Sequence, residues 1–239
     1  MKKLFIGALS LLLILSCKKE VELTFSEVNI LHNDNAVIEL NIPRANEDTD
    51  VGKSINKVIN DHIANTLNFS EDFTESIPLE QAIKKFQEEY KTFKADFEES
   101  ALVWEATFDG EVVYKSNDVI CIALSNYTNT GGAHGNANIT LYNFNPQSGS
   151  VYSLNDLVSD EEALTALAKD FFIKELEMNS DEHLEDYFFG EDFHLPANIG
   201  FNEDGLLMLY NVYEIASYAQ GITEFTIPFK DVQPLLKLY

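Results

Sequence analysis

Apolar residues recur every three or four positions in two segments of the first half of the chain, which predicts two amphipathic helices. The first helix has its apolar face at Ile55, Val58, Ile59, Ile63 and Leu67. The second has it at Leu79, Ile83, Phe86, Tyr90, Phe93 and Phe97, with Pro78 suited to its first turn. Before the helices we expect strands at residues 24–31 and 36–42, a turn at 32–35 between them, and a polar loop at 43–50.

From Leu102 the pattern changes to an alternation of apolar and polar residues, which predicts an antiparallel meander. Asp109-Gly110 is typical of a hairpin turn between two of its strands, and further strands are expected at residues 119–124 and 138–144. Ser159 and Glu162 have the spacing of a capping box. The elements expected after it are a helix at residues 160–178, a hairpin at 199–212 with its turn at 202–205, a strand at 223–229 and a short helix at 232–236.

Together these elements predict an α+β fold in which antiparallel sheets are packed with helices. Strands and helices are expected in both halves of the chain, and the change of pattern falls close to residue 100. We therefore expect two subdomains, at residues 24–100 and 101–239.

The first residues have the features of a secretory signal. Lys2 and Lys3 precede an apolar run, Leu4–Leu15, which is shorter than the roughly 20 residues of a membrane-spanning helix. The run ends at Ser16-Cys17, which resembles a lipoprotein cleavage site. We expect a signal peptide at residues 1–16, lipidation of Cys17 and a tether at residues 17–23. The alternative is an ordinary signal peptide in which Cys17 is incidental.

The predicted lipid anchor implies a location in the cell envelope and the membrane as one partner. A lipid anchor would attach it to a membrane of the cell envelope. Lys18, not aspartate, follows the cysteine, so no signal for retention in the inner membrane is evident. We expect the outer membrane.

The chain is strongly acidic, with a formal net charge of -24. Such a charge repels nucleic acid and anionic lipid headgroups, and it accelerates the encounter with cationic partners. The alternative is that the charge serves solubility alone. Cys121 has no partner for a disulfide if Cys17 is acylated, and its apolar neighbours predict a buried strand residue and not a nucleophile.

Residues 129–136 are rich in glycine and lie between two predicted strands. Gly131, Gly132, His134 and Gly135 could expose backbone N–H groups to a ligand, or the glycines could serve a tight bend. Neither a Walker A loop nor a dinucleotide fingerprint is present.

Residues 213–221, Tyr-Glu-Ile-Ala-Ser-Tyr-Ala-Gln-Gly, form the second unusual segment. Exposed tyrosines recur in binding surfaces and stack on sugar rings. We expect Tyr218 to be exposed and Gln220 to lie beside it as a ligand contact, whereas Tyr213 is expected to be a core residue of a strand.

No pattern in the sequence argues for a metal, a cofactor or catalysis. The histidines lack the spacing of a helical zinc site, and His183 and His194 offer only a weak case for a metal shared across a loop. Residues 202–205 lack most of a calcium-loop pattern. A Gly-x-Ser-x-Gly elbow is also missing. We therefore expect a protein that is not an enzyme and has no cofactor.

Several short motifs in order resemble a known family. They are Thr130–Gly135, Tyr142–Asn145, Ser148-Gly149, Leu154–Leu157, Tyr213–Ala216, Tyr218–Gly221, Glu224-Phe225 and Ile227-Pro228. This series resembles an extracytoplasmic domain family of uncertain function, found in lysozyme-responsive anti-sigma-V factors and beside the catalytic domain of certain peptidoglycan deacetylases. The resemblance covers residues 101–239. The preceding segment is similar to the deacetylase accessory domain that usually comes before it.

The resemblance implies a non-catalytic binding or sensing module. The deacetylase catalytic domain and the cytoplasmic anti-sigma segment are not found in this sequence. In the anti-sigma relatives the extracellular part binds lysozyme, a basic protein, so the implied partners are a basic protein such as lysozyme or a cell-wall glycan. The alternative is an enzyme, or an accessory subunit of one, in cell-wall glycan modification.

Overall fold

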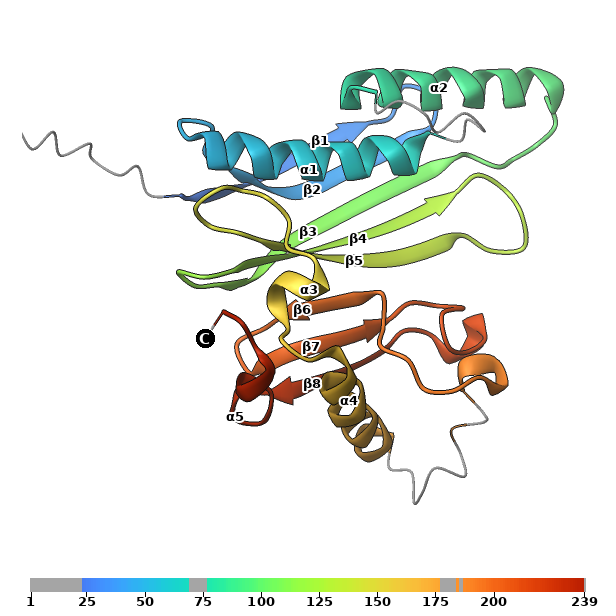
Figure 1. The fold of residues 1–239 in the computed structure, drawn as a ribbon. Coiled ribbons are helices and arrows are strands. Elements are labelled where there is room, and N and C mark those ends of the chain that lie inside the picture. Colours follow the sequence, from blue (N-terminus) through green and yellow to red (C-terminus); the bar gives the residue numbers. More distant parts are fainter. Residues whose placement is uncertain (1–22, 69–76, 177–183, 185–186, 239) are drawn as a thin grey trace, which may run out of the picture.

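Two β-sheets and the helices that cover them form an α+β fold, as expected from the sequence (Figure 1). The computed structural model describes residues 23–68, 77–176, 184 and 187–238. The first sheet has the order β1 (Phe25–His32), β2 (Val37–Ala45), β3 (Glu105–Lys115), β4 (Ile120–Asn129) and β5 (Asn136–Phe144). The second has the order β6 (Asn198–Phe201), β7 (Gly205–Tyr210) and β8 (Thr223–Pro228).

The helices within the described ranges lie between and after these strands. The α-helices are α1 (Asp50–Leu67), α2 (Leu79–Asp96), α3 (Leu154–Leu157), α4 (Glu161–Glu175) and α5 (Phe229–Val232). Short 3-10 turns are η2 (Phe188–Gly190), η3 (Tyr218–Gln220) and η4 (Gln233–Leu235). None of the helices in these ranges has the length and hydrophobicity that a bilayer crossing requires. The predicted signal peptide, Cys17 and nearly all of the tether lie outside the described residues.

The first sheet is mixed, which departs from the expected antiparallel arrangement. β3, β4 and β5 form the predicted antiparallel meander, but β2 and β3 run parallel, with Val37 opposite Glu105. The long α1–α2 crossover makes this pairing possible, because parallel neighbours need a connection of a dozen residues or more. The sheet takes strands from residues 25–144, so it crosses the boundary expected near residue 100.

The hairpin expected at Asp109-Gly110 is wrong, because both residues lie inside the continuous strand β3. Gly110 pairs with Leu124 of β4. A Cβ atom on Gly110 would lie 2.6 Å from Cδ of Pro43 and 2.8 Å from Cδ2 of Leu124. The glycine therefore permits close packing between strands and does not form a turn. Pro43, expected in a loop, belongs to β2 and pairs with Glu27 of β1.

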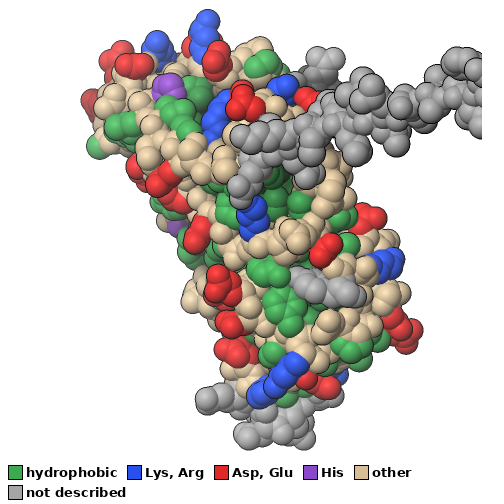
Figure 2. All heavy atoms as spheres, turned by 90° about the vertical axis from the view of Figure 1, so that its left-hand side faces the viewer, with side chains coloured by type: hydrophobic (Ala, Val, Ile, Leu, Met, Phe, Trp, Pro, Cys, Tyr) green, Lys and Arg blue, Asp and Glu red, His purple; other side chains and the backbone are tan. Residues whose placement is uncertain are grey.

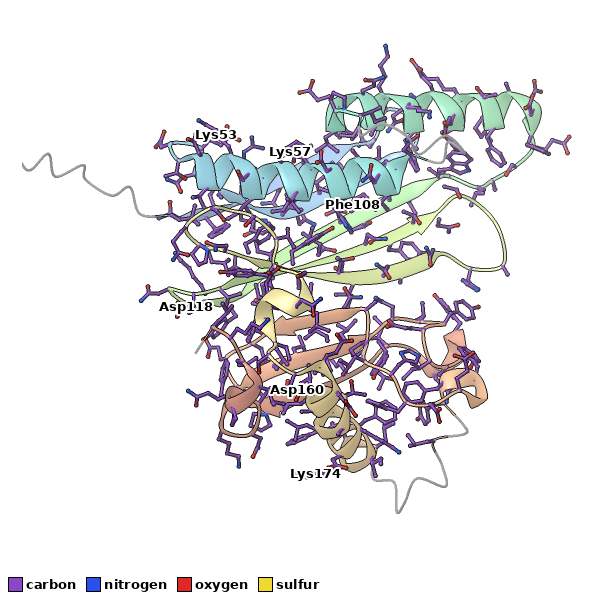
Figure 3. All side chains as sticks on the ribbon, in the orientation of Figure 1. Lys53, Lys57, Phe108, Asp118, Asp160 and Lys174 are labelled. Carbon is purple, nitrogen blue, oxygen red and sulfur yellow. The ribbon has the colours of Figure 1, made fainter. Side chains whose placement is uncertain are left out.

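Helices α1 and α2 cover one face of the first sheet, as their periodicity predicts. Their apolar faces and the sheet enclose one core, in which Ile59, Phe86 and Phe108 are at most 1% exposed. Figure 3 shows side chains filling the space between these helices and the sheet. Helix α1 begins at the N-cap Thr49, whose hydroxyl accepts a hydrogen bond from Gly52 N over 2.9 Å.

The second sheet packs on the opposite face of the first, with α4 on its far side. A second core, which includes Cys121, Phe172 and Tyr210, fills this region. Helix α4 is capped by Asp160, which accepts from Ala163 N, and not by the predicted Ser159–Glu162 capping box. Ser159 instead donates to Leu235 O through its backbone N–H and its hydroxyl, which fastens the C-terminal segment.

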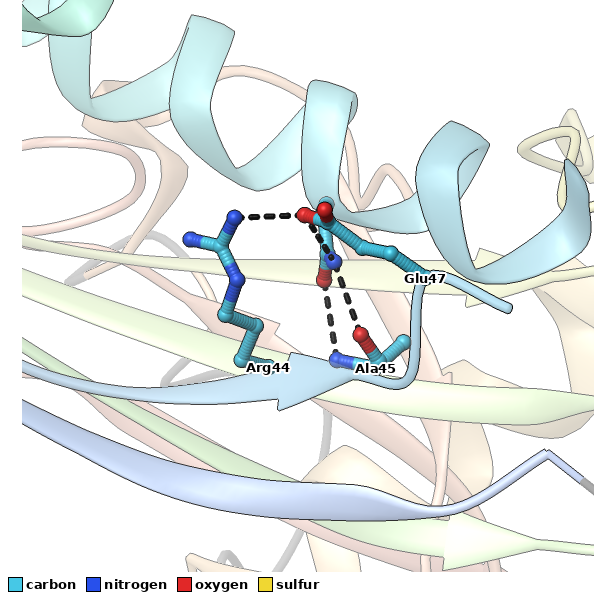
Figure 4. Close-up of polar contacts among 4 residues, drawn as sticks. Arg44, Ala45 and Glu47 are labelled. Atoms are coloured by element: carbon cyan, nitrogen blue, oxygen red, sulfur yellow. Dashed lines mark hydrogen bonds and ion pairs between the residues drawn. The ribbon is translucent and has the colours of Figure 1, made fainter. Parts of the chain in front are cut away.

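Asparagine side chains complete the edges of several strands. Asn56 of α1 is 5% exposed and bonds both backbone groups of Ala45 at the end of β2, accepting from N over 2.9 Å and donating to O over 2.8 Å. Figure 4 shows this contact beside the Arg44–Glu47 ion pair. An amide side chain offers the same donor and acceptor as a peptide group, so it can replace a missing neighbouring strand.

Asparagine side chains also bond backbone groups between the two sheets. Asn211, just after β7, accepts from Ile139 N and donates to Ile139 O, both over 2.8 Å. Asn198 of β6 accepts from Leu141 N over 3.1 Å. Backbone groups on the outer edge of β5 are therefore satisfied by side chains of the second sheet.

Candidate functional site

The β4–β5 connection is shaped by its glycines. Gly131 and Gly132 have φ values of +107° and +123°, a region that side chains with a Cβ atom rarely adopt. Gly135 is buried, and a Cβ atom there would lie 2.3 Å from the ring of Tyr127. The first two glycines therefore serve the turn, and the third allows the chain to pass over an aromatic ring.

The β7–β8 connection approaches the same place from the second sheet. Asn211 fixes its start to β5, and Glu214 accepts from Asn211 N over 2.8 Å and from Ala197 N over 2.7 Å. Tyr213 has φ +65°. This uncommon backbone conformation turns the chain away from the line of β7, so the tyrosine side chain leaves the core.

Three aromatic side chains from these two connections meet, and we call Tyr213, His134 and Tyr218 the aromatic cluster. The rings of His134 and Tyr218 are stacked, with centroids 4.0 Å apart and an interplanar angle of 22°. The ring of Tyr213 lies 5.6 Å from that of Tyr218. Figure 1 shows that both connections lie at the same end of the two sheets.

Hydrogen bonds fix the imidazole within this cluster. Nδ1 of His134 lies 2.7 Å from Gly135 O, and Nε2 lies 3.3 Å from the hydroxyl of Tyr213. A carbonyl oxygen can only accept, so Nδ1 carries the proton, and in the neutral ring Nε2 accepts from Tyr213. The hydroxyl of Tyr218 also points to Gly135 O, at 3.5 Å.

Exposure within the cluster is the reverse of what the sequence predicts. Tyr213, expected in the core, is 55% exposed, whereas Tyr218, expected to be exposed, is half-buried beneath the imidazole. β7 ends at Tyr210, before the predicted strand does, so Tyr213 belongs to a turn and not to a strand. The motif that begins at Tyr213 indicated that this residue is unusual, but its assignment to a strand led to the expectation that it is buried.

The other predicted ligand residues have structural roles in this geometry. Gln220 is exposed, and its side-chain oxygen accepts from Ser217 N over 3.2 Å in a capping box of η3. Gly131 and Gly132 shape the turn that presents His134. The structure therefore brings together His134 and Tyr218 of the predicted set, adds Tyr213, and directs the amide of Gln220 to the backbone of its own turn.

A second exposed aromatic lies beside this end of the molecule. Phe188 and Phe189 have φ values of +56° and +53°, and Phe188 N donates to Ile215 O over 2.6 Å. Phe188 is buried, but Phe189 is 66% exposed. Left-handed conformations of bulky residues are costly and concentrate in functional regions. This strained segment is held against the connection that carries Tyr213 and Tyr218.

The polar contacts of the cluster are few. In the described part of the chain, His134 hydrogen-bonds a carbonyl oxygen and a phenol, not a carboxylate or a serine, and no group of three potential metal ligands is found. His194 points to Leu195 O, and His183 lies outside the described residues. Cys121 is fully buried, as predicted, and burial raises the pKa of its thiol to about 12.

Acidic side chains are scattered over the face seen in Figure 2, among a few basic side chains, and do not gather in one patch on that face. On this face the acidic side chains form no localised site for a cation.

Two family matches cover successive parts of the chain. Residues 31–137 match deacetylase PdaC, and residues 155–230 match DUF3298, a protein family of unknown function. The His134 turn falls in the first match, and Tyr213 and Tyr218 fall in the second, so the aromatic cluster joins the two regions. No curated protein sequence matches the chain.

Solved structures have the same fold. A DUF3298 family member from Bacteroides fragilis superposes with a TM-score of 0.68 at 20% identity, covering 90% of this chain and 93% of that one. A DUF3298 family protein from Pseudomonas aeruginosa gives a TM-score of 0.61 at 19% identity, covering 90% and 95%. The resemblance predicted from the motifs is confirmed: residues 31–137 are similar to deacetylase PdaC and residues 155–230 are similar to the DUF3298 family.

Proposed function

We propose that this chain is a non-catalytic binding module of the cell envelope, and that the aromatic cluster is its ligand-binding surface. The observation that carries the proposal is the contact between His134 and Tyr213. These residues are 79 positions apart in the sequence, and the ring of Tyr213 is exposed. The match to deacetylase PdaC, a region associated with the cell envelope, supports the location. The predicted lipid anchor at Cys17 would hold the module on a membrane, which we take to be the outer membrane.

The ligand class that fits the cluster is a glycan, such as a peptidoglycan fragment. Aromatic rings give a large apolar contact area at small entropic cost, and sugar rings present a flat C–H face to them. The Tyr213 hydroxyl donates to His134 Nε2, so its oxygen can still accept a hydrogen bond from a hydroxyl or amide group around such a ring. A site with apolar rings and few polar groups is typical of small-molecule recognition.

The experiment is a calorimetric titration of the purified protein with muropeptides. Tyr213→Ala should weaken binding by about fivefold or more, because ring stacking contributes about 0.5–1.5 kcal/mol beyond the buried area. The matched control is Tyr152→Ala, a half-buried tyrosine whose hydroxyl donates to Asp118 O at 3.3 Å. Equal affinity of wild type and Tyr213→Ala, or an equal loss in the control, would contradict the assignment.

A basic protein such as lysozyme is the second candidate ligand, and the net charge of -24 favours it. The Debye length shortens from about 30 Å at 0.01 M salt to about 8 Å at 0.15 M, so steering by this charge must weaken over that range. Association with lysozyme should slow about tenfold while dissociation changes less. Cytochrome c, basic but different in shape, is the control. If both proteins bind alike, the attraction is unspecific.

Catalysis on glycans is the alternative function, and it is tested directly. Muropeptides incubated with the protein should keep their mass and acetylation state, because the imidazole of His134 contacts neither a carboxylate nor a nucleophile. Release of acetate, or of shorter glycans, by the wild type but not by His134→Ala would replace the binding proposal with an enzymatic one.

A further inference from the structure

A hollow whose lining shares no residue with the aromatic cluster lies between the C-terminal half of α1 and strand β5. Its volume of about 390 Å³ falls within the range of small-molecule sites, about 300–1,000 Å³. The residues that line it are Val58, Asp61, His62, Asn65, Thr66 and Tyr142. Five of these carry polar side chains, and they come from two elements of the first sheet and its helix layer.

His62 and Tyr142 form the fixed wall of the hollow. Nδ1 of His62 lies 3.1 Å from the Tyr142 hydroxyl, and the rings meet edge to face, with centroids 5.8 Å apart. Burial lowers the pKa of His62 and raises the pKa of Tyr142. Both rings are therefore neutral near pH 7. Nδ1 of His62 is engaged by the Tyr142 hydroxyl and Nε2 is buried, so the pair offers apolar contact and the phenol oxygen, and no charge.

The rim offers further neutral groups. The Thr66 hydroxyl donates to His62 O over 3.0 Å, so its oxygen can still accept a hydrogen bond. Asn65 is exposed and presents an amide with donor and acceptor. Val58 contributes an aliphatic contact beside them.

The charge balance of the hollow excludes anions. Its single carboxylate, Asp61, forms an ion pair with Lys57 one turn earlier on α1, and Lys57 is labelled in Figure 3. The Lys57 side chain is 71% exposed and is not part of the lining. Among the described residues, the lining therefore has no cationic group for a phosphate or a carboxylate, and its acid is already paired.

We propose that this hollow is a binding site for a neutral pyranose sugar that carries hydroxyl and acetamido groups. The edge of Tyr142 and the side chain of Val58 contact the ring, and Asn65, Thr66 and Asp61 bond its polar substituents. Neutral amide and hydroxyl partners around an aromatic wall match this chemistry, whereas a charged ligand would need a free counter-charge. The site is separate from the aromatic cluster and does not depend on the proposed function of that cluster.

The test is a titration of the protein with N-acetylglucosamine, followed by backbone amide NMR shifts. We expect saturable shifts at Asn65 and Thr66 with ligand up to about 20 mM, within the millimolar range of weak sites. Thr66→Val and Asn65→Ala should each weaken binding by about fivefold or more. Thr92→Val is the matched control, because the Thr92 hydroxyl makes the same bond to the carbonyl four residues before it, at 3.2 Å.

Three further results separate this site from its alternatives. Tyr213→Ala should leave these shifts unchanged, because that residue belongs to the aromatic cluster. Glucosamine, which carries an ammonium group, should bind no more tightly than its acetylated form; tighter binding would make the hollow an amine site and overturn the proposal. Absence of saturable shifts at Asn65 and Thr66, or an equal loss in Thr92→Val, would also overturn it.

Discussion

Asn211 offers the sharpest test of how the two sheets hold the aromatic cluster together. Its side chain is 8% exposed and bonds both the N–H and the C=O of Ile139, each over 2.8 Å. Asn211→Ala leaves these two buried backbone groups without their partner. A buried polar group that loses its hydrogen bond costs about 1–3 kcal/mol. Because water can enter part of the space, we expect the free energy of unfolding to fall by about 2–4 kcal/mol.

The assay is urea unfolding followed by circular dichroism, with two comparisons in the same protein. Asn198→Ala removes one bond, to Leu141 N at 3.1 Å, and should cost about half as much. Asn138→Ala removes a longer bond, to Thr140 Oγ1 at 3.3 Å, and should stay within about 0.5 kcal/mol. If Asn211→Ala is no more destabilising than Asn138→Ala, asparagine pairing does not join the sheets. If the order holds, weaker muropeptide binding by Asn211→Ala would follow from a displaced β7–β8 connection.

Four further predictions concern other residues. Burial raises the pKa of Cys121 to about 12, so the stabilisation from its neutral thiol is present below the unfolded-state pKa of about 8.5 and is lost as pH rises toward 12. Cys121→Ala should make the fall in stability above pH 9 shallower, and an unchanged slope in urea unfolding would contradict this. Gly135→Ala should destabilise the protein more than Gly132→Ala, because the first Cβ atom would overlap a ring, whereas the second would meet no atom within 4 Å and would be strained only through its φ of +123°; equal midpoints would refute the packing role. His134→Ala should stay within about 1 kcal/mol of wild type, and a larger loss would make the ring a structural anchor. Cys17→Ala should abolish labelling by a palmitate analogue, and equal labelling of both proteins would end the lipoprotein prediction.

Helix periodicity was the most reliable guide to the fold. Ile55, Ile59 and Ile63 all lie in the core beneath α1, and Phe86 does the same for α2, because a stripe of apolar residues every 3.6 positions can be buried only as a helix face. Strand positions were also predicted from alternation, although their ends were not. Such local patterns depend on neighbours in sequence, so the sequence contains what is needed to interpret them.

Sequence patterns were a poorer guide where a distant neighbour decides the local structure. Asp109-Gly110 is typical of a turn, but at Gly110 the absence of a side chain is used for contact with Pro43 and Leu124. The parallel pairing of β2 with β3 brings together residues on both sides of the expected boundary near residue 100. Neither contact leaves a trace in the spacing of apolar residues, because both depend on which strands become neighbours.

The candidate site has the same division between local and distant causes. The glycines around His134 indicated an unusual turn, and the two tyrosines indicated a second unusual connection. Each of the two connections that form the site could therefore be predicted separately. What the sequence could not supply is their meeting, which depends on the amide of Asn211 bonding Ile139 across 72 residues. Asn211 lies two residues before Tyr213, and its partner Ile139 lies three residues after Asn136, where β5 begins. A single buried amide therefore couples the packing of the two sheets to the geometry of the aromatic cluster. Substitution of Asn211 should lower both stability and binding, whereas substitution of Tyr213 should lower binding alone.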